Sequence, residues 1–150
     1  LMSLSRLLAT QQTRMDHLIS LMEQEQQLLT QGDIDGEALA HLAEEKQLLL
    51  AELDKMEALR RDVQKRLGYP NGHAGAKQAS QDANCQDDWQ SLLIKSERVA
   101  RMNDLTGQML SLRMKHNQQM LDYIRQIAEK TLYKPDGRNS AQPGRINASA

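Results

Sequence analysis

The chain has 150 residues, with 19 basic and 20 acidic side chains and a formal net charge of −1. Phe is absent, Trp occurs once and Tyr three times, whereas Leu, Gln, Glu and Ala are abundant. Such helix-forming composition, poor in aromatic and β-branched residues, predicts an all-α protein. The balanced charge argues against nucleic acid as a partner.

The cellular location follows from three weak signals. No apolar run approaches the ~20 residues of a membrane-spanning helix, and no signal peptide opens the chain. The single cysteine, Cys85, cannot form an internal disulfide, which fits a reducing compartment. We therefore expect a cytoplasmic protein without direct membrane insertion.

The first predicted helix covers residues 3–30. Its apolar residues recur at about 3.5-residue spacing and form a seam: Leu4, Leu8, Met15, Leu18, Met22 and Leu29. Polar Gln11 and Glu25 occupy two further positions of this seam. In the stretch "QGDIDGEAL", Gly32 is expected to end this helix and Asp33 or Asp35 to cap the next. A connection this short predicts an antiparallel helical hairpin.

The second predicted helix covers residues 36–67. Its heptad seam has nine positions: Leu39, Leu42, Lys46, Leu49, Leu53, Met56, Arg60, Val63 and Leu67. Seven of them are apolar, and Lys46 and Arg60 are the exceptions. Gly, Pro, Asn and Ser then gather in residues 68–86, where Pro70 cannot continue the helix. This segment is expected to be a flexible loop.

The third predicted helix covers residues 87–130 and begins at Asp87 or Asp88 as a cap. The remaining residues, 131–150, contain little to bury and are expected to form a mobile tail. The predicted fold is a long antiparallel helical hairpin plus a long third helix, forming a coiled-coil-like bundle in a single domain.

The third predicted helix has an unusually wide apolar side. On a helical wheel its apolar residues cover roughly 200°, about twice the ~100° stripe that faces one core. Asn103, Thr106, Arg113 and Asn117 interrupt this side. Exposed apolar surface commonly marks a binding site, and Met side chains adapt to different partners. Two alternatives remain open: a central position within the bundle, and self-association through this helix.

No sequence motif indicates catalysis. The chain has no phosphate-binding glycine loop, no nucleophile motif and no repeated Glu-x-x-His pair, and its four histidines lie far apart. We therefore expect neither an enzyme nor a bound cofactor or metal.

Four stretches resemble one family: "MEQEQQLLTQGDIDG" (22–36), "LAEEKQLLLAELDKMEALRR" (42–61), "RMNDLTGQMLSLRMKHNQQMLDYI" (101–124) and "TLYKPDG" (131–137). Their order and spacing resemble the FlgN family of flagellar type III secretion chaperones. The position of the second family asparagine differs, because Leu105-Thr106-Gly107 stands where that residue often falls.

The resemblance implies a cytoplasmic chaperone that binds the C-terminal helical regions of flagellar hook-associated (hook–filament junction) proteins. It would prevent their premature assembly and deliver them to the flagellar type III export apparatus at the inner membrane. Wheel and resemblance together assign the client-binding surface to Met102, Leu105, Met109, Leu110, Leu112, Arg113, Met114, Asn117, Met120, Leu121, Ile124 and Ile127. The resemblance also suggests Tyr133 as a docking residue for the cytoplasmic domain of the export gate, or for another export component.

Two other functions fit the helical pattern. A structural coiled-coil module would dimerise through the third helix and have no export role. An amphipathic membrane-surface protein would need a polar side rich in Lys and Arg. The polar side of the third helix carries mainly Gln, Asp and Ser, with Lys115 and Arg125 as its basic residues. We therefore expect no binding to lipid vesicles.

Overall fold

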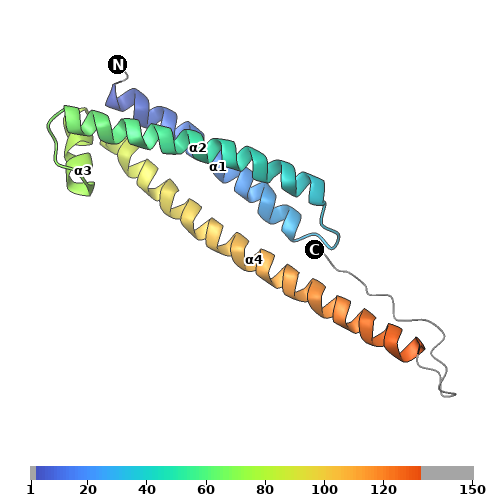
Figure 1. The fold of residues 1–150 in the computed structure, drawn as a ribbon. Coiled ribbons are helices and arrows are strands. Elements are labelled where there is room, and N and C mark those ends of the chain that lie inside the picture. Colours follow the sequence, from blue (N-terminus) through green and yellow to red (C-terminus); the bar gives the residue numbers. More distant parts are fainter. Residues whose placement is uncertain (1–2, 133–150) are drawn as a thin grey trace. The chain divides into compact units, whose positions relative to one another are not determined.

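The structure, a computed structural model, describes residues 3–132 and the side chains of residues 3–130. Over this range it contains four α-helices and no strand, which confirms the all-α prediction: α1 (Leu4–Leu29), α2 (Gly36–Arg66), α3 (His73–Asp82) and α4 (Gln86–Leu132) (Figure 1). The contacts divide the chain into two compact units, Leu1–Gly107 and Gln108–Ala150. In the second unit the structure describes one element, the C-terminal part of α4.

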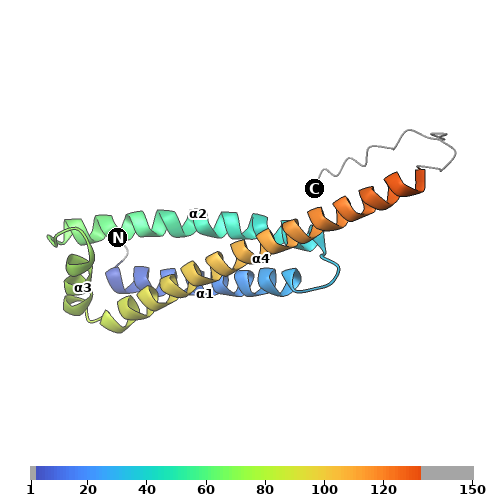
Figure 2. The same ribbon diagram turned by 90° about the horizontal axis from the view of Figure 1, so that it is seen from below.

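Helices α1 and α2 form the predicted antiparallel hairpin and lie side by side in both views (Figures 1 and 2). Three polar contacts between the helices fix this direction: Gln11 with Glu57 at 3.1 Å, Arg14 with Glu52 at 3.1 Å, and Glu25 with Lys46 at 3.0 Å. The residue numbers rise on α1 as they fall on α2. The two helices also share a buried apolar cluster: Leu18, Leu21, Met22, Leu42 and Leu49.

Polar caps set the ends of the hairpin helices. Ser3 accepts from the Arg6 backbone N–H at the start of α1. Asp35 accepts from the Ala38 N–H at 3.1 Å, so Asp35 rather than Asp33 caps α2. Gly32 does not end α1, because the helix stops at Leu29 with Thr30 as its C-cap. A Thr30 hydroxyl that donates to the Gln27 carbonyl at 2.7 Å favours this earlier end.

The prediction of a flexible loop over residues 68–86 was wrong, because α3 occupies its centre. Ala, Lys and Gln in this segment are good helix formers. Gly75, Ala76, Ala79 and Ser80 form the buried face of α3. Because these side chains are small, they allow close packing but give no strong apolar periodicity in the sequence.

Helix α3 helps to close one end of the hairpin. A second buried cluster there joins α1, α3 and the start of α4: Leu4, Leu8, Ala76, Ala79, Cys85, Trp89 and Leu92. Gly68 and Gly72 have positive φ angles of 88° and 101°, which side chains disfavour, so glycine is suited to the turn between α2 and α3. A Tyr69 hydroxyl that donates to the Asp82 carboxylate connects this turn to the end of α3.

Up to Gly107, α4 runs parallel to α1. Gln12 contacts Asp88 at 2.7 Å, Glu23 contacts Arg98 at 2.6 Å, and Gln26 contacts Thr106 at 3.3 Å. The numbers rise together on both helices. Lys95 adds contacts to Gln12 and Asp16 at 3.0 and 2.9 Å. Helix α1 is therefore packed against α2 and also against the first half of α4.

The start of α4 differs from the predicted one. The Trp89 N–H donates to the Cys85 carbonyl at 3.1 Å, and the helix begins at Gln86. Asp87 and Asp88 therefore lie in the first turn rather than at the cap, where their negative charge still favours the helix start. The helix continues through Gly107 to Leu132. The predicted tail, 131–150, therefore begins too early, because residues 131 and 132 still belong to α4. The rest of it, 133–150, lies outside the described residues.

Candidate functional site

In the first unit, one face of α4 is used for intramolecular packing. Trp89 and Leu92 are buried, and Val99 and Met102 pack against the apolar cluster of the hairpin. Thr106 is 3% exposed, and its hydroxyl oxygen accepts from Gln26. Gln26 also donates to the Met102 carbonyl at 3.2 Å. The hairpin thus holds α4 by both apolar and polar contacts as far as Thr106.

Met102 and Thr106 belong to this packed face, although they lie in the wide apolar side predicted from the sequence. Met102 is half-buried and contacts the hairpin cluster. Thr106 is a buried hydrogen-bonding residue and not part of an open surface. Asn103, another polar interruption, is exposed, as is Leu105.

The second unit contains most of the predicted client-binding residues. Leu112 and Met114 are 67% and 65% exposed. The other exposed members are Leu110, Asn117, Met120, Ile124 and Ile127, and the half-buried members are Met109, Arg113 and Leu121. We name the apolar residues of this set from Leu110 onward the α4 apolar surface: Leu110, Leu112, Met114, Met120, Leu121, Ile124 and Ile127. Whether this surface binds a client stays a prediction, and Tyr133 lies outside the described residues.

Tyr123, which is 60% exposed, lies among these residues on α4. Its ring joins an apolar body to a polar hydroxyl, a combination that is favoured at protein interfaces. Tyr123 lies on the apolar side of the helical wheel, so the sequence alone could have included it in the predicted client-binding surface.

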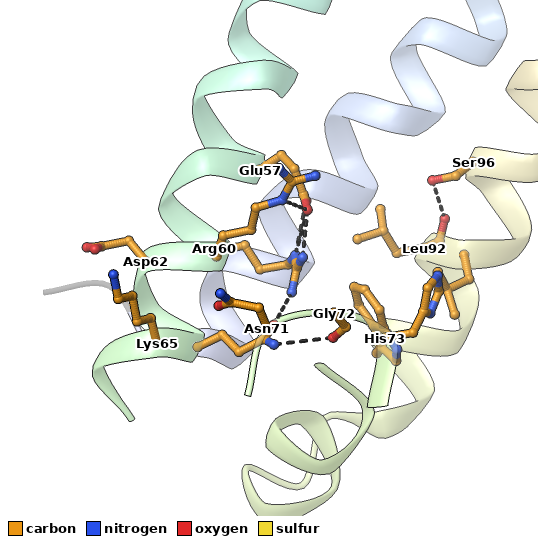
Figure 3. Close-up of a pocket in the computed structure, with 13 residues that line it drawn as sticks. Glu57, Arg60, Asp62, Lys65, Asn71, Gly72, His73, Leu92 and Ser96 are labelled. Carbon is orange, nitrogen blue, oxygen red and sulfur yellow. Dashed lines mark hydrogen bonds and ion pairs between the residues drawn. The ribbon is translucent and has the colours of Figure 1, made fainter. Parts of the chain in front are cut away.

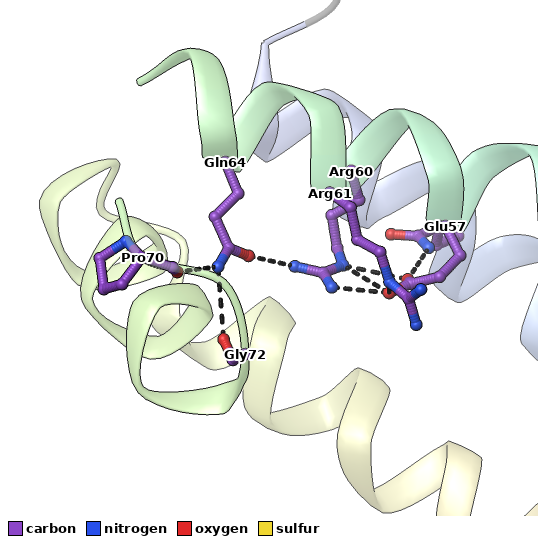
Figure 4. A network of polar contacts seen from close by, with 7 residues as sticks. Glu57, Arg60, Arg61, Gln64, Pro70 and Gly72 are labelled. Carbon is purple, nitrogen blue, oxygen red and sulfur yellow. Dashed lines mark hydrogen bonds and ion pairs between the residues drawn. The ribbon is translucent and has the colours of Figure 1, made fainter. Parts of the chain in front are cut away.

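A polar cluster on α2 was not anticipated from the sequence (Figure 4). The Glu57 carboxylate accepts from Arg60 Nε at 3.1 and 3.0 Å and from its terminal nitrogen at 2.6 Å. Gln11 and Arg61 also donate to Glu57, at 3.1 and 3.2 Å. Arg60 donates to Gln64, which in turn donates to the carbonyls of Pro70 and Gly72. The cluster thus connects α1 and α2 to the turn before α3.

The charge state of Glu57 follows from two opposing effects. Burial disfavours the carboxylate, but hydrogen bonds from Arg60 and Gln11 and the positive charges of Arg60 and Arg61 favour it more strongly. The pKa of Glu57 is consequently lowered from its usual value of 4.5. Glu57 is therefore ionised at neutral pH, and its charge is matched by Arg60.

An open cleft of about 770 Å³ adjoins this cluster (Figure 3). Side chains of α2 lie on one side, and Leu92 and Ser96 of α4 lie on the other. The Arg60 guanidinium carbon is 4.7 Å from the centre of the Trp89 ring, a cation–π distance. The His73 ring is tilted against the same indole at 6.0 Å. Residues far apart in the sequence form this cleft, which is why helical periodicity did not reveal it.

In the part of the chain that the structure describes, no three His, Cys, Asp or Glu residues are grouped so as to hold a metal ion. Likewise, no helix within residues 3–132 has both the length and the apolar character to cross a membrane.

Comparison with known proteins confirms the family resemblance of the sequence. The family model described as FlgN protein matches residues 1–141. The Flagella synthesis protein FlgN of Salmonella typhimurium (strain LT2) is 33% identical over 137 residues, covering 91% of this chain and 90% of the relative. The protein of the same name from Escherichia coli (strain K12) is 32% identical over 126 residues, covering 84% and 82%. No solved structure matches the chain significantly. The chain therefore belongs to the FlgN family.

Proposed function

We propose that this protein acts in flagellum synthesis as a cytoplasmic export chaperone. Its clients are the C-terminal helical regions of flagellar hook-associated proteins, the proteins of the hook–filament junction. It keeps these regions from assembling early and delivers them to the flagellar type III export apparatus. The printed names of the relatives, Flagella synthesis protein FlgN, support the flagellar part of the proposal. No catalytic step is needed.

The observation that carries the chaperone part is the exposure of large apolar side chains along residues 110–127 of α4. Leu112 and Met114 expose about two thirds of their surface to water. Such exposure is unfavourable at roughly 25 cal/mol per Å² of apolar area, so a partner that covers these side chains gains this free energy. An amphipathic helix of the client would supply the complementary apolar face.

Reversible binding is consistent with the composition of this surface. Met114 and Met120 have flexible thioether side chains that adapt to different apolar partners. Exposed Asn117 lies between them in the sequence, and its amide prefers hydrogen bonds to apolar contact. A client held by such a mixed surface can be released at the export apparatus without covalent chemistry.

Delivery requires a second contact, with the export gate cytoplasmic domain or another export component. We propose Tyr133 for this contact on the basis of sequence resemblance alone. In cells, Tyr133→Ala should lower the export of hook-associated proteins while the purified variant binds the client fragment as the wild type does. Loss of both activities would show that Tyr133 contributes to the client site.

The proposal is tested by light scattering after size-exclusion chromatography of the protein with a purified C-terminal fragment of a hook-associated protein. A complex of one chain with one fragment is expected. A homodimer that excludes the fragment would instead support the structural coiled-coil module that self-associates through α4.

A further inference from the structure

The cleft between α2, α3 and α4 is a second surface, formed entirely by residues of the first unit. It shares no residue with the α4 apolar surface. Its lining combines a charged side and an apolar side: Glu57, Arg60, Arg61, Asp62, Gln64, Lys65, Asn71, Gly72, His73, Trp89, Leu92, Leu93 and Ser96 (Figure 3).

The charged side of the cleft has a local excess of positive charge. Arg60 occupies both oxygens of Glu57, and Asp62 is paired with Arg66 at 3.0 Å. Each of the two acids in the lining is thus paired with one arginine. Arg61 and Lys65 are two further cations whose charge these acids do not neutralise, although Arg61 also contacts Glu57 at 3.2 Å.

Arg61 and Lys65 are four residues apart on α2, so they share a helix face. Like charges at this spacing destabilise a helix. Both side chains are exposed, and Arg61 is 74% exposed. A carboxylate placed between them would relieve the repulsion and would leave the partly buried Arg60–Glu57 pair intact.

The apolar side of the cleft comes from α4. Its residues follow the i, i+3, i+4, i+7 spacing of one helix face: apolar Trp89, Leu92 and Leu93, and then polar Ser96. Leu93 is half-buried, so it offers apolar area that a ligand could cover. A helix with apolar residues along one side and acidic residues along the other would complement both walls.

We propose that this cleft binds an acidic amphipathic segment of a second protein. Acidic side chains of that segment contact Arg61 and Lys65, and its apolar side chains pack against the half-buried Leu93. The chain's own residues 133–150 do not have this chemistry, because they contain Lys134, Arg138 and Arg145 but one acid, Asp136. The proposal gives the protein a partner site that is separate from the client site.

The single tryptophan of the chain lies in this cleft, so its fluorescence reports occupancy. The probe is a synthetic helical peptide with Leu at i, i+3, i+4 and i+7 and Glu at the remaining positions. A peptide with the same Leu residues and Lys in place of Glu is the control. We expect a saturable change in Trp89 emission with the acidic peptide and none with the basic one. A flat titration with the acidic peptide, or equal responses to both peptides, would overturn the proposal.

Charge reversal separates this cleft from general electrostatic attraction. The double variant Arg61→Glu, Lys65→Glu should weaken binding of the acidic peptide by about tenfold or more, since exposed ion pairs contribute up to ~1 kcal/mol each. The matched control Lys55→Glu, Lys77→Glu changes net charge equally at exposed residues outside the cleft. Its affinity should stay within about twofold of the wild type. Equal loss in both double variants would show that net charge, and not the cleft, attracts the peptide.

Discussion

Lys46 of α2 donates to both carboxylate oxygens of Glu25 of α1, each at 3.0 Å. The side chains are 18% and 7% exposed, so the pair lies inside the hairpin seam. Removing charges from water is costly, and a single arrangement of the two helices brings these charges together. The contact therefore favours one register of α1 against α2 over arrangements shifted by a turn.

We predict that breaking this pair on one side destabilises the protein. Lys46→Leu leaves the Glu25 carboxylate buried without its cation, which should lower the free energy of unfolding by about 3 kcal/mol. The double variant Glu25→Leu, Lys46→Leu should recover most of this loss, because it leaves no unpaired charge. Urea unfolding of the wild type, both single variants and the double variant measures the coupling. Additive effects of the two substitutions would contradict the proposed coupling.

Two glycines in helices should respond oppositely to alanine. A Cβ at Gly75 would lie 1.8 Å from the Pro70 carbonyl oxygen and 2.8 Å from Gln64 Nε2. Gly75→Ala must displace the Pro70 backbone and disturb the Gln64 hydrogen bond, at a cost of about 2 kcal/mol or more. Thermal unfolding should show a clearly lower midpoint.

Gly107 provides the matched comparison. Apart from the adjoining residues and the backbone of its own helix turn, no atom lies within 4 Å of a Cβ placed there, and the residue is helical. Gly107→Ala should therefore stabilise α4 by up to about 1 kcal/mol through its higher helix propensity. The helical signal in far-ultraviolet circular dichroism should melt at the same or a higher temperature. A lower melting temperature would indicate that the helix requires glycine at this position.

Stability should depend on pH through Glu57. Its pKa is lower in the folded protein than the usual 4.5, so the folded state binds this proton more weakly than the unfolded chain does. The stabilisation is fully present above the unfolded pKa and is lost as pH falls through the lower, folded value. We predict that the difference in urea midpoint between wild type and Glu57→Gln shrinks as pH falls below about 4.5. A difference that stays constant over that range would contradict the role of Arg60.

Local sequence signals were sufficient for the hairpin and the long helix. Gln11 and Glu25 were placed on the seam of α1, and both are buried there. The short connection predicts the antiparallel direction of α2, and Asp35 is one of the two caps that the sequence predicts. These features depend on spacing along one helix or across one turn, which a sequence displays directly.

The features that were missed depend on distant parts of the chain. Ala76 and Ala79 are buried in the same cluster as Trp89 and Leu92, and nothing within residues 73–82 predicts that packing. Helical periodicity predicts the whole apolar side of α4. It does not show which part of that side packs inside the protein, because this depends on how α4 lies parallel to α1. The contacts of Gln26 with Met102 and Thr106 show this arrangement.

The most direct test of the client surface is calorimetric titration of a hook-associated C-terminal fragment into matched double variants. Met114→Asp, Met120→Asp alters the α4 apolar surface, whereas Leu48→Asp, Leu59→Asp alters two exposed leucines of α2. We predict that the first pair weakens binding at least about 100-fold, which corresponds to ~2.7 kcal/mol, and that the second leaves affinity nearly unchanged. Both should keep the wild-type helical signal. Equal affinity of the first pair and the wild type would contradict the client site on α4.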